Sequence, residues 1–330
     1  MSALLLPALE YPFDGQASPL AEEVDRACYR WGEGWGIYCL GDPGEYRRTR
    51  VGWLAAYTAP SATWAGLRLL ADWQMWLFAF DDGYCDESEH GAQPEAMIRR
   101  VVDFLGALDH RGPALDDVRT VRSAAEARFH AALSDLAARL RADAQGFQRA
   151  RFLSAVSGYF MAQCWETANR SAAARGGLPP SPAEYIRLRR DSGAVRTCIA
   201  LTDVAGGYRL SAEDYDHPRV TALTDMAVDV ACWANDILSY PKEVRRSRIV
   251  HSLPAVLGHW RQLTPQAALE AAARMHNQQV QRYLAAELPI RAHAAEPLRR
   301  YLDDLRSWMT GNLRWSLSTG RYNTGEGRTA

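Results

Sequence analysis

The sequence predicts an all-α fold, and three observations support this prediction. Apolar residues recur at intervals of three and four along most of the chain, which is the spacing of one face of an α-helix. No segment shows a convincing alternation of apolar and polar residues, as a strand would. Glycine or proline separates most of the periodic segments. The 330 residues contain no internal repeat and no linker long enough to separate domains, so we expect one domain over residues 1–330.

The ends of the predicted helices follow from residues that favour helix starts and stops. The first helix opens with Ser18 and Pro19, carries acidic residues in its first turn and closes at Gly32. Another begins at Pro182, because proline is well tolerated in a first turn. Residues 1–17 form an N-terminal segment before the first helix. In chain order, the expected helices span residues 18–31, 47–57, 64–80, 94–108, 115–141, 147–168, 182–205, 220–240, 265–286 and 298–317.

Composition and charge exclude several classes of function. The formal net charge is −1 and the basic residues are scattered, so we expect neither a nucleic-acid nor a membrane-surface partner. No apolar stretch approaches the roughly 20 residues that span a bilayer, and the N-terminal residues lack the basic start and cleavage site of a signal peptide. The six cysteines form no C-x-x-C pair. We therefore expect reduced core cysteines in a cytoplasmic protein, not a zinc or redox site.

A set of oxygen-bearing side chains recurs along residues 228–243. Asn235, Ser239 and Glu243 stand four and eight residues apart, which places them on one face of a helix. An amide oxygen, a hydroxyl and a carboxylate are hard donors, which suit Mg²⁺ better than zinc or copper. Pro241 predicts that this helix bends or ends between Ser239 and Glu243. The alternative is a buried helix with polar ends and no metal.

A second acidic group ends an aromatic run over residues 76–87, where Asp81, Asp82, Asp86 and Glu87 follow apolar residues. Clustered carboxylates repel one another, so this arrangement is costly unless a cation neutralises them. The alternative is a solvated helix end. Two oxygen-donor faces on two helices would suit several Mg²⁺ ions that hold a diphosphate between them, because Mg²⁺ commonly completes its coordination with water and phosphate oxygens.

The two motifs together resemble those of bacterial class I terpene synthases. In that family an aspartate-rich motif and an N-D-x-x-S-x-x-x-E motif bind three Mg²⁺ ions and a prenyl diphosphate. The second motif is complete here, with Asp236 after Asn235, and Lys242 occupies a position that is often basic. The first motif has the stretched form, because Cys85 stands four residues after Asp81. The resemblance leaves open which aspartates bind metal directly.

The resemblance extends to an arginine that senses the diphosphate. In the family this arginine stands 46 positions before the motif asparagine, and here it is Arg189. A guanidinium can engage two diphosphate oxygens at once. We expect the neighbouring Arg187 and Arg190 to belong to a solvated face. The effector position, at which the helix breaks, is Gly193, and Ser192 stands where the family usually has aspartate.

The C-terminal residues also match the family, which ends in W-x-x-x-x-x-R-Y and here has Trp315, Arg321 and Tyr322. Composition alone would predict a disordered end for residues 318–330. The resemblance instead implies a mobile lid that brings Arg321 and Tyr322 to the diphosphate and excludes water. We expect most aromatic residues to pack in the core. Phe78, about a turn before the aspartates, and Trp315 are our candidates for the cavity wall.

The resemblance covers essentially the whole chain and implies a class I terpenoid synthase helical bundle around a central cavity. The implied reaction is Mg²⁺-dependent ionisation of a prenyl diphosphate, with farnesyl diphosphate as the expected substrate, followed by cyclisation to a terpene hydrocarbon or alcohol. Three Mg²⁺ ions would neutralise the departing diphosphate together with Arg189, Lys242 and Arg321. Mn²⁺ is a possible substitute for Mg²⁺. The resemblance is also compatible with a homodimer.

Three alternatives remain open at this stage. The substrate could be geranyl or geranylgeranyl diphosphate, the product could be a linear alcohol, or the protein could be a non-catalytic helical binding protein. A chain-elongating prenyltransferase is not expected, because it would carry a second aspartate-rich motif in place of residues 235–243.

Overall fold

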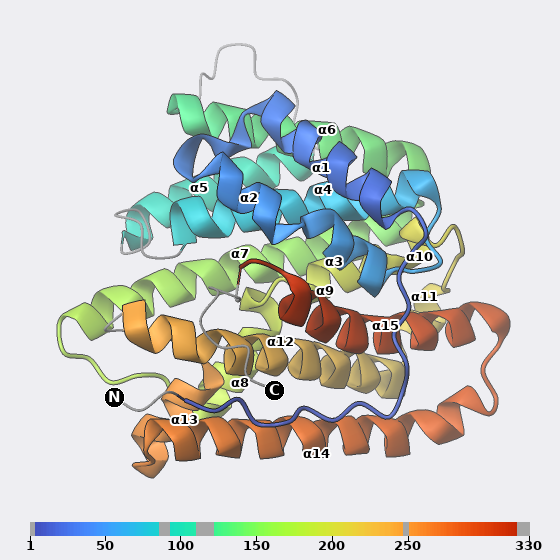
Figure 1. The fold of residues 1–330 in the computed structure, drawn as a ribbon. Helices are drawn as coiled ribbons and strands as arrows, with labels where there is room; N and C mark the ends of the chain where they lie inside the picture. Colours follow the sequence, from blue (N-terminus) through green and yellow to red (C-terminus); the bar gives the residue numbers. More distant parts are fainter. Residues whose placement is uncertain (1–3, 86–92, 110–121, 247–250, 322–330) are drawn as a thin grey trace.

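A computed structural model of the protein describes residues 4–85, 93–109, 122–246 and 251–321 (Figure 1). Every regular element in these ranges is helical, which confirms the predicted all-α class. None of these helices is both long enough and apolar enough to span a membrane.

The helices before residue 150 include two short irregular elements. They are α1 (Ala21–Trp35), the 3₁₀-helix η1 (Ile37–Leu40), α2 (Pro43–Thr49), α3 (Val51–Thr58), α4 (Trp64–Phe80), the π-helical turn η2 (Asp81–Cys85), α5 (Pro94–Asp109), α6 (Ala124–Asp143) and α7 (Gly146–Ala174). The second half contains α8 (Pro182–Ser192), α9 (Val195–Ile199), α10 (Thr202–Ala205), α11 (Ala212–Asp216), α12 (Pro218–Arg246), α13 (Leu253–Arg261), α14 (Pro265–Arg291) and α15 (Glu296–Ser318).

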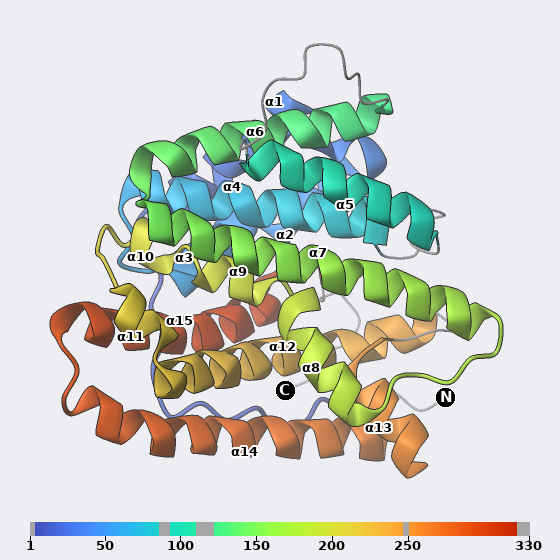
Figure 2. The same ribbon diagram turned by 180° about the vertical axis from the view of Figure 1, so that it is seen from behind.

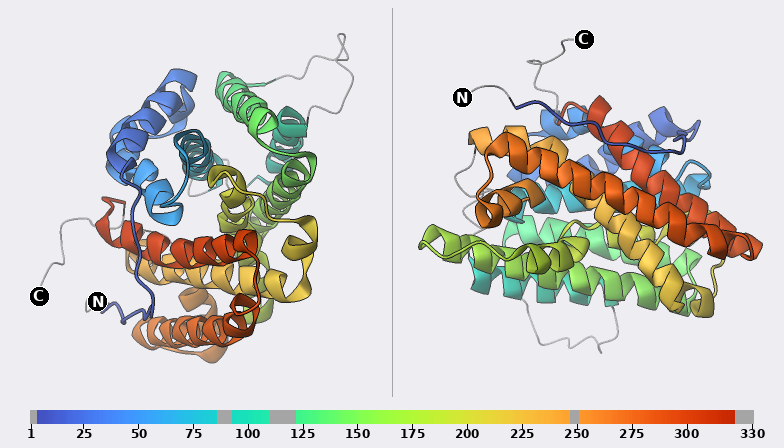
Figure 3. Two further views of the ribbon diagram at one scale, coloured as in Figure 1. Left: turned by 90° about the vertical axis from the view of Figure 1, so that its right-hand side faces the viewer. Right: turned by 90° about the horizontal axis from the view of Figure 1, so that it is seen from below.

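The long helices surround a central region. In Figures 1 and 2, α1, α4, α5 and α6 lie in the upper part of the molecule and α12, α14 and α15 in the lower part. On one side α3 packs against both α4 and α15, and on the other α7 packs against α5 and α8, while α8 also packs against α12. The short α9 lies inside this ring, where it contacts α4, α7, α12 and α15. The end-on view in Figure 3 shows this arrangement.

The N-terminal segment lies along the outside of α14 (Figures 1 and 3). Gln266 of α14 accepts a hydrogen bond from the backbone N–H of Leu5 at 3.0 Å and donates one to its carbonyl at 3.1 Å. Asn277, three turns further along, bonds to the backbone of Ala8 and Glu10 at 3.2 and 3.1 Å. These side chains satisfy backbone groups of a segment that has no secondary structure of its own.

A cluster of aromatic residues forms the core between α4, α5, α6 and α7, in line with the expected packing of aromatic side chains. Trp76 has no exposed surface and packs edge-on against Phe104 and Phe129, with ring centroids 5.5 and 5.9 Å away. Its indole N–H donates to the carbonyl of Phe129 at 3.0 Å. Phe80 continues this cluster by stacking on Trp76 at 5.0 Å. The α4 face that carries Trp76 and Phe80 is therefore occupied by packing and is not open to a ligand.

The structure corrects several of the expected helices. The predicted helix 47–57 is divided at Arg50 into α2 and α3, and α11 was not predicted. The predicted helix 182–205 is divided into α8, α9 and α10, and α13 was not predicted. Pro241 does not end its helix, because α12 runs through it to Arg246. Proline removes one intrahelical hydrogen bond, but α12 packs against α8, α13, α14 and α15, and this packing supports the continuous helix.

Candidate active site

The ring of helices encloses a cavity of about 850 Å³. Every predicted site residue within the described ranges lines it, namely Phe78, Asp81, Asp82, Arg189, Gly193, Asn235, Ser239, Lys242, Glu243, Trp315 and Arg321. The other two predicted residues, Asp86 and Tyr322, lie outside the described residues. Charged and polar groups gather in one part of the cavity wall, and the remainder is mostly apolar.

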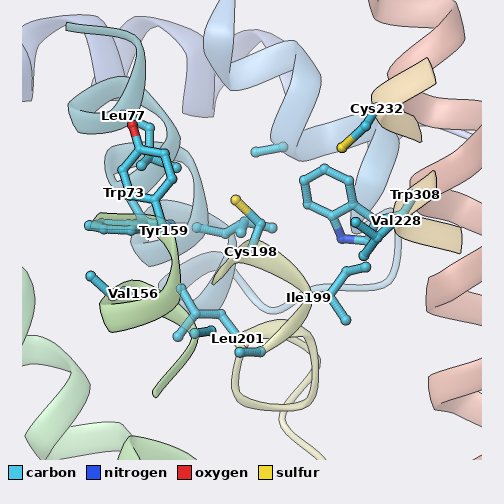
Figure 4. Packing of buried hydrophobic residues seen from close by; sticks show 14 of the residues in the cluster. Trp73, Leu77, Val156, Tyr159, Cys198, Ile199, Leu201, Val228, Cys232 and Trp308 are labelled. Carbon is cyan, nitrogen blue, oxygen red and sulfur yellow. The ribbon is translucent and has the colours of Figure 1, made fainter. Parts of the chain in front are cut away.

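The apolar part of the wall comes from five helices. Leu77 of α4 and Tyr159 of α7 lie on one side, Trp308 of α15 and Cys232 of α12 lie on the other, and Cys198 of α9 stands between them (Figure 4). Each of these side chains is almost completely buried. Such a wall can contain a reactive hydrocarbon cation, because it presents aromatic faces and few nucleophiles.

The acidic motif begins where α4 changes its hydrogen-bonding pattern. Asp81 and Asp82 open the π-helical turn η2, and both are partly exposed, whereas Gly83, Tyr84 and Cys85 are buried. A π-turn widens a helix and is frequent at functional sites. The result is that both carboxylates reach the cavity directly after the buried aromatic face of α4.

Asp82 is held by the C-terminal arginine. The Arg321 guanidinium donates to both carboxylate oxygens of Asp82, at 2.7 and 3.1 Å. The same guanidinium carbon lies 4.9 Å from the ring centroid of Phe78, and Lys242 donates to the backbone carbonyl of Arg321 at 3.0 Å. The C-terminal end of the described chain is thereby connected to both oxygen-donor motifs.

Phe78 and Trp315, the two predicted wall residues, lie next to each other, and Arg321 lies over the Phe78 ring. The ring centroids of Phe78 and Trp315 are 5.4 Å apart, and both side chains line the cavity. The Trp315 indole N–H is directed away from the cavity by the carbonyls of Thr49 and Arg50, at 2.9 and 3.1 Å. An anchored indole presents its aromatic surface and not its polar edge.

The second motif forms one face of α12, as its spacing predicted. Asn235, Ser239 and Glu243 all line the cavity. The Asn235 amide oxygen accepts a hydrogen bond from Arg189 at 3.1 Å. Ser239 is 5% exposed, and among the described residues its hydroxyl makes a single long bond of 3.5 Å, to the carbonyl of Asp236.

These donors fit magnesium. The candidate ligands all offer oxygen atoms and come from two separate helical segments that face one cavity. They are Asp81 and Asp82 of η2 and Asn235, Ser239 and Glu243 of α12. Within the described ranges, no three residues of the types His, Cys, Asp and Glu cluster as a closed metal cage would require. Mg²⁺ needs few protein ligands when water or phosphate oxygens complete its shell. The structure is therefore consistent with an open site for a divalent metal.

Asp236, although inside the motif, is enclosed by protein donors. It is 1% exposed and accepts hydrogen bonds from the Tyr185 hydroxyl at 2.7 Å, Arg189 Nε at 2.9 Å and the backbone N–H of Leu253 at 3.0 Å. Burial raises the pKa of its carboxyl, and the charge of Arg189 opposes this effect. Asp236 lines the cavity, but its carboxylate oxygens are engaged by protein donors, and it therefore orients Arg189. Tyr185 was not predicted, although it stands one turn before Arg189 on α8.

The predicted helix break lies at Gly193, the last residue before a change of chain direction. Ala194 has a positive φ of 60°, and α9 starts directly after it. The Gln163 amide donates to the carbonyl of Ser192 at 3.1 Å and thereby secures the break. The Ser192 hydroxyl, at the position where the family usually has aspartate, is buried and has no hydrogen-bond partner among the described residues.

We expect Gly193→Ala to destabilise the protein by about 1–3 kcal/mol, as overpacking commonly does. A Cβ at this position would lie 2.4 Å from the sulfur of Cys232, which is itself buried. Cys232→Ala removes that sulfur, so the double variant should recover at least half of the loss in free energy of unfolding. Urea denaturation of the four proteins measures both effects, and an unchanged midpoint in Gly193→Ala would contradict the close contact.

Several wall residues were missed by sequence reasoning. Glu166 and Arg170 of α7 line the polar part and form an ion pair at 3.5 Å. Gln74 and Asn312 are amides in the wall, on α4 and α15. Asn312 could have been suspected, because it stands four residues after Trp308 and three before Trp315, on the same face of a helix.

Comparison with known proteins agrees with this site. The family model described as "Terpene synthase family 2, C-terminal metal binding" matches residues 72–282. The 4-epi-cubebol synthase of Streptosporangium roseum, whose name states that it cyclises (2E,6E)-farnesyl diphosphate, is 34% identical over 328 residues, which are 99% of this chain and 94% of that protein. The (+)-T-muurolol synthase of Roseiflexus castenholzii is 33% identical over 317 residues, covering 95% of this chain and 93% of the relative.

Solved structures show the same fold. A crystal structure of a protein from ancestral sequence reconstruction has a TM-score of 0.83 and 27% identity, covering 94% of this chain and 90% of that one. The matched segment of the family model contains both oxygen-donor motifs and Arg189. Its description as metal-binding agrees with the open oxygen-donor site described above. The chain belongs to the terpene synthases, in the family that contains these bacterial enzymes.

Proposed function

We propose that this terpene synthase ionises farnesyl diphosphate in an Mg²⁺-dependent reaction and cyclises the resulting cation to a terpene hydrocarbon or alcohol, with release of diphosphate. One observation carries the proposal. The cavity joins two oxygen-donor faces and the cationic side chains Arg189, Lys242 and Arg321 to an apolar wall elsewhere. The names of the two relatives cited above support a substrate of fifteen carbons over the shorter and longer alternatives.

In this proposal Asp81, Asp82 and Asp86 from one helix end, and Asn235, Ser239 and Glu243 from α12, hold three Mg²⁺ ions. The ions, when bound, neutralise charge on the departing diphosphate. Because the described donors are all oxygens, Mn²⁺ is expected to substitute for Mg²⁺.

The cationic side chains bind the diphosphate oxygens. Arg189 is positioned for this role by Asp236 and Tyr185, so little reorganisation is needed when negative charge develops. Lys242 lies beside Arg321 and contributes a second positive charge. Gly193 lies at the helix break between α8 and α9, at the effector position that the resemblance implies.

Arg321 connects ionisation to closure. We propose that residues 318–330 act as a lid within a single domain of residues 1–330. Arg321 would exchange the Asp82 carboxylate for diphosphate oxygens, and Tyr322 would join it there. The bidentate Arg321–Asp82 pair supports this idea, because it shows that the arginine reaches the acidic motif. Closure would keep water away from the cation.

The test is incubation of the protein with geranyl, farnesyl and geranylgeranyl diphosphate separately, with Mg²⁺, with Mn²⁺ and with a chelator. Diphosphate release and the mass of the organic products are both measured. We expect a metal-dependent fifteen-carbon cyclic product from farnesyl diphosphate, and loss of turnover with the chelator. A product from another substrate alone would correct the chain length. No diphosphate release from any of them by folded protein would overturn the proposal in favour of a binding protein.

A further inference from the structure

Asn312 places one amide in the otherwise apolar part of the cavity wall. It belongs to α15, four residues after Trp308 and three before Trp315, and all three line the cavity. Its amide nitrogen donates to the carbonyl of Ala231 at 3.0 Å. A carbonyl can only accept, so the contact decides which end of the amide faces α12. The amide oxygen therefore lies on the opposite side of a planar group whose orientation is set.

This oxygen accepts no hydrogen bond from the part of the chain that the structure describes. Asn312 is 7% exposed and lines the cavity, so that small surface faces the cavity and not bulk solvent. An unpaired carbonyl oxygen in an apolar wall is unfavourable unless a donor reaches it. In proteins such groups are usually satisfied by ordered water.

A second amide in the wall behaves differently. Gln74 is 2% exposed, and both its amide nitrogen and its amide oxygen are closed off from water without a hydrogen-bond partner among the described residues. Asn312 is not in that condition, because its nitrogen is paired with Ala231 and its oxygen is not among the fully enclosed side-chain atoms without a partner. Asn312 is thus the wall amide that can accept a hydrogen bond from a guest.

We propose that the Asn312 amide oxygen holds one water molecule in the cavity and that this water captures the final carbocation, so that the main product is an alcohol. The inference rests on the proposed function. When the hydrocarbon chain of the substrate fills the cavity, it cannot replace the hydrogen bond of this water, and so displacing the water is unfavourable. Ala231 stands one helical turn, a rise of about 6 Å, before Asn235 on the same face of α12, so Asn312 contacts this helix one turn before the first proposed metal donor.

The proposed reaction supplies every atom and electron pair that water capture requires. The water donates one hydrogen to Asn312 Oδ1, which leaves an oxygen lone pair available to the cation. A carbon–oxygen bond forms between that lone pair and the cationic carbon, giving a protonated alcohol. The excess proton passes to the diphosphate that the ionisation step released. No oxidant or reductant is required, and the net reaction is prenyl diphosphate plus water giving alcohol plus protonated diphosphate.

The experiment measures diphosphate release and product composition in water enriched in ¹⁸O. For the wild-type protein we expect most of the product to be an alcohol whose oxygen carries the label. Asn312→Leu keeps the approximate side-chain size and removes the acceptor, and Asn312→Ala removes the acceptor and enlarges the cavity. Both should lower the ratio of labelled alcohol to hydrocarbon at least fivefold, while diphosphate release falls no more than about tenfold.

Two controls separate the acceptor from cavity shape. A pure shape effect would move the Leu and Ala variants in different directions, because one fills the wall and the other opens it. Asn277→Ala removes an amide that does not line the cavity and should keep the labelled-alcohol ratio within twofold of wild type.

Three outcomes would overturn the inference. A wild-type product that is only hydrocarbon would show that no water is held for capture. An unlabelled alcohol, or an unchanged ratio in both Asn312 variants, would show that Asn312 does not position the water. All three are distinguishable from failure of the proposed function, in which wild-type protein releases no diphosphate.

Discussion

Asn235→Ala is expected to lower the rate of diphosphate release by about 10³-fold, which is the size of the loss when a central electrostatic group is removed from an active site. Two contributions disappear together. The amide oxygen is the first donor on the metal-binding face of α12, and it also accepts the 3.1 Å hydrogen bond from Arg189. The variant is therefore expected to bind metal more weakly and to hold the arginine less firmly.

The helical fold should survive this substitution, because alanine favours helix and Asn235 is not part of the core. Asn277→Ala is the matched control. It removes the same side chain from α14, where the amide bonds only to the N-terminal segment and His276, and its rate should stay within about twofold. Circular dichroism reports on the fold and a diphosphate assay on the rate. A normal rate in Asn235→Ala would refute its assignment to the metal face.

Arg189→Ala is expected to lower the free energy of unfolding by about 3–5 kcal/mol, the range for removing one partner of a buried ion pair. Its partner Asp236 is 1% exposed and would keep only a tyrosine hydroxyl and one backbone N–H as donors. Arg189→Lys retains the charge but not the two-pronged geometry. It should lose less stability than Arg189→Ala and still lose about 10²-fold in diphosphate release.

Arg187 provides the matched control on the same helix. Its side chain is exposed, so Arg187→Ala should change the free energy of unfolding by less than about 0.5 kcal/mol. Guanidinium denaturation of the three variants measures these differences. If Arg189→Ala and Arg187→Ala were equally stable, the Arg189–Asp236 pair would not hold α8 to α12 as the structure indicates.

The arginines of α8 show that spacing along the sequence does not reveal the binding partner of every side chain. The sequence distinguished Arg189 only by its distance from Asn235, and the structure places it against Asp236 and Asn235 in the cavity wall. Arg190 was expected to be solvated, but it makes a two-pronged bond to Asp229, at 2.8 Å to each oxygen, on a part of α12 outside the site. Neighbouring residues on one helix thus have different partners, which depend on what packs against each face.

The sequence by itself determined the donor face of α12. Asn235, Ser239 and Glu243 share a face because residues four apart always do so in an α-helix, whatever surrounds it. The same local geometry predicted an all-helical chain and an acidic end to α4. These features depend on a few consecutive turns and need no knowledge of the rest of the molecule.

Only the tertiary structure decided which side chains meet from distant parts of the chain. Arg321 binds Asp82 across 239 positions of sequence, and the roles of Trp76 in the core and Trp315 in the cavity wall differ although both are buried aromatic residues. The orientation of the Asn312 amide depends on its hydrogen bond to Ala231, 81 positions earlier in the chain. The hydrophobic free energy depends on how much apolar surface is buried and very little on which residues surround it. The packing of helices against one another, and not the local pattern, therefore selects which residues face the cavity.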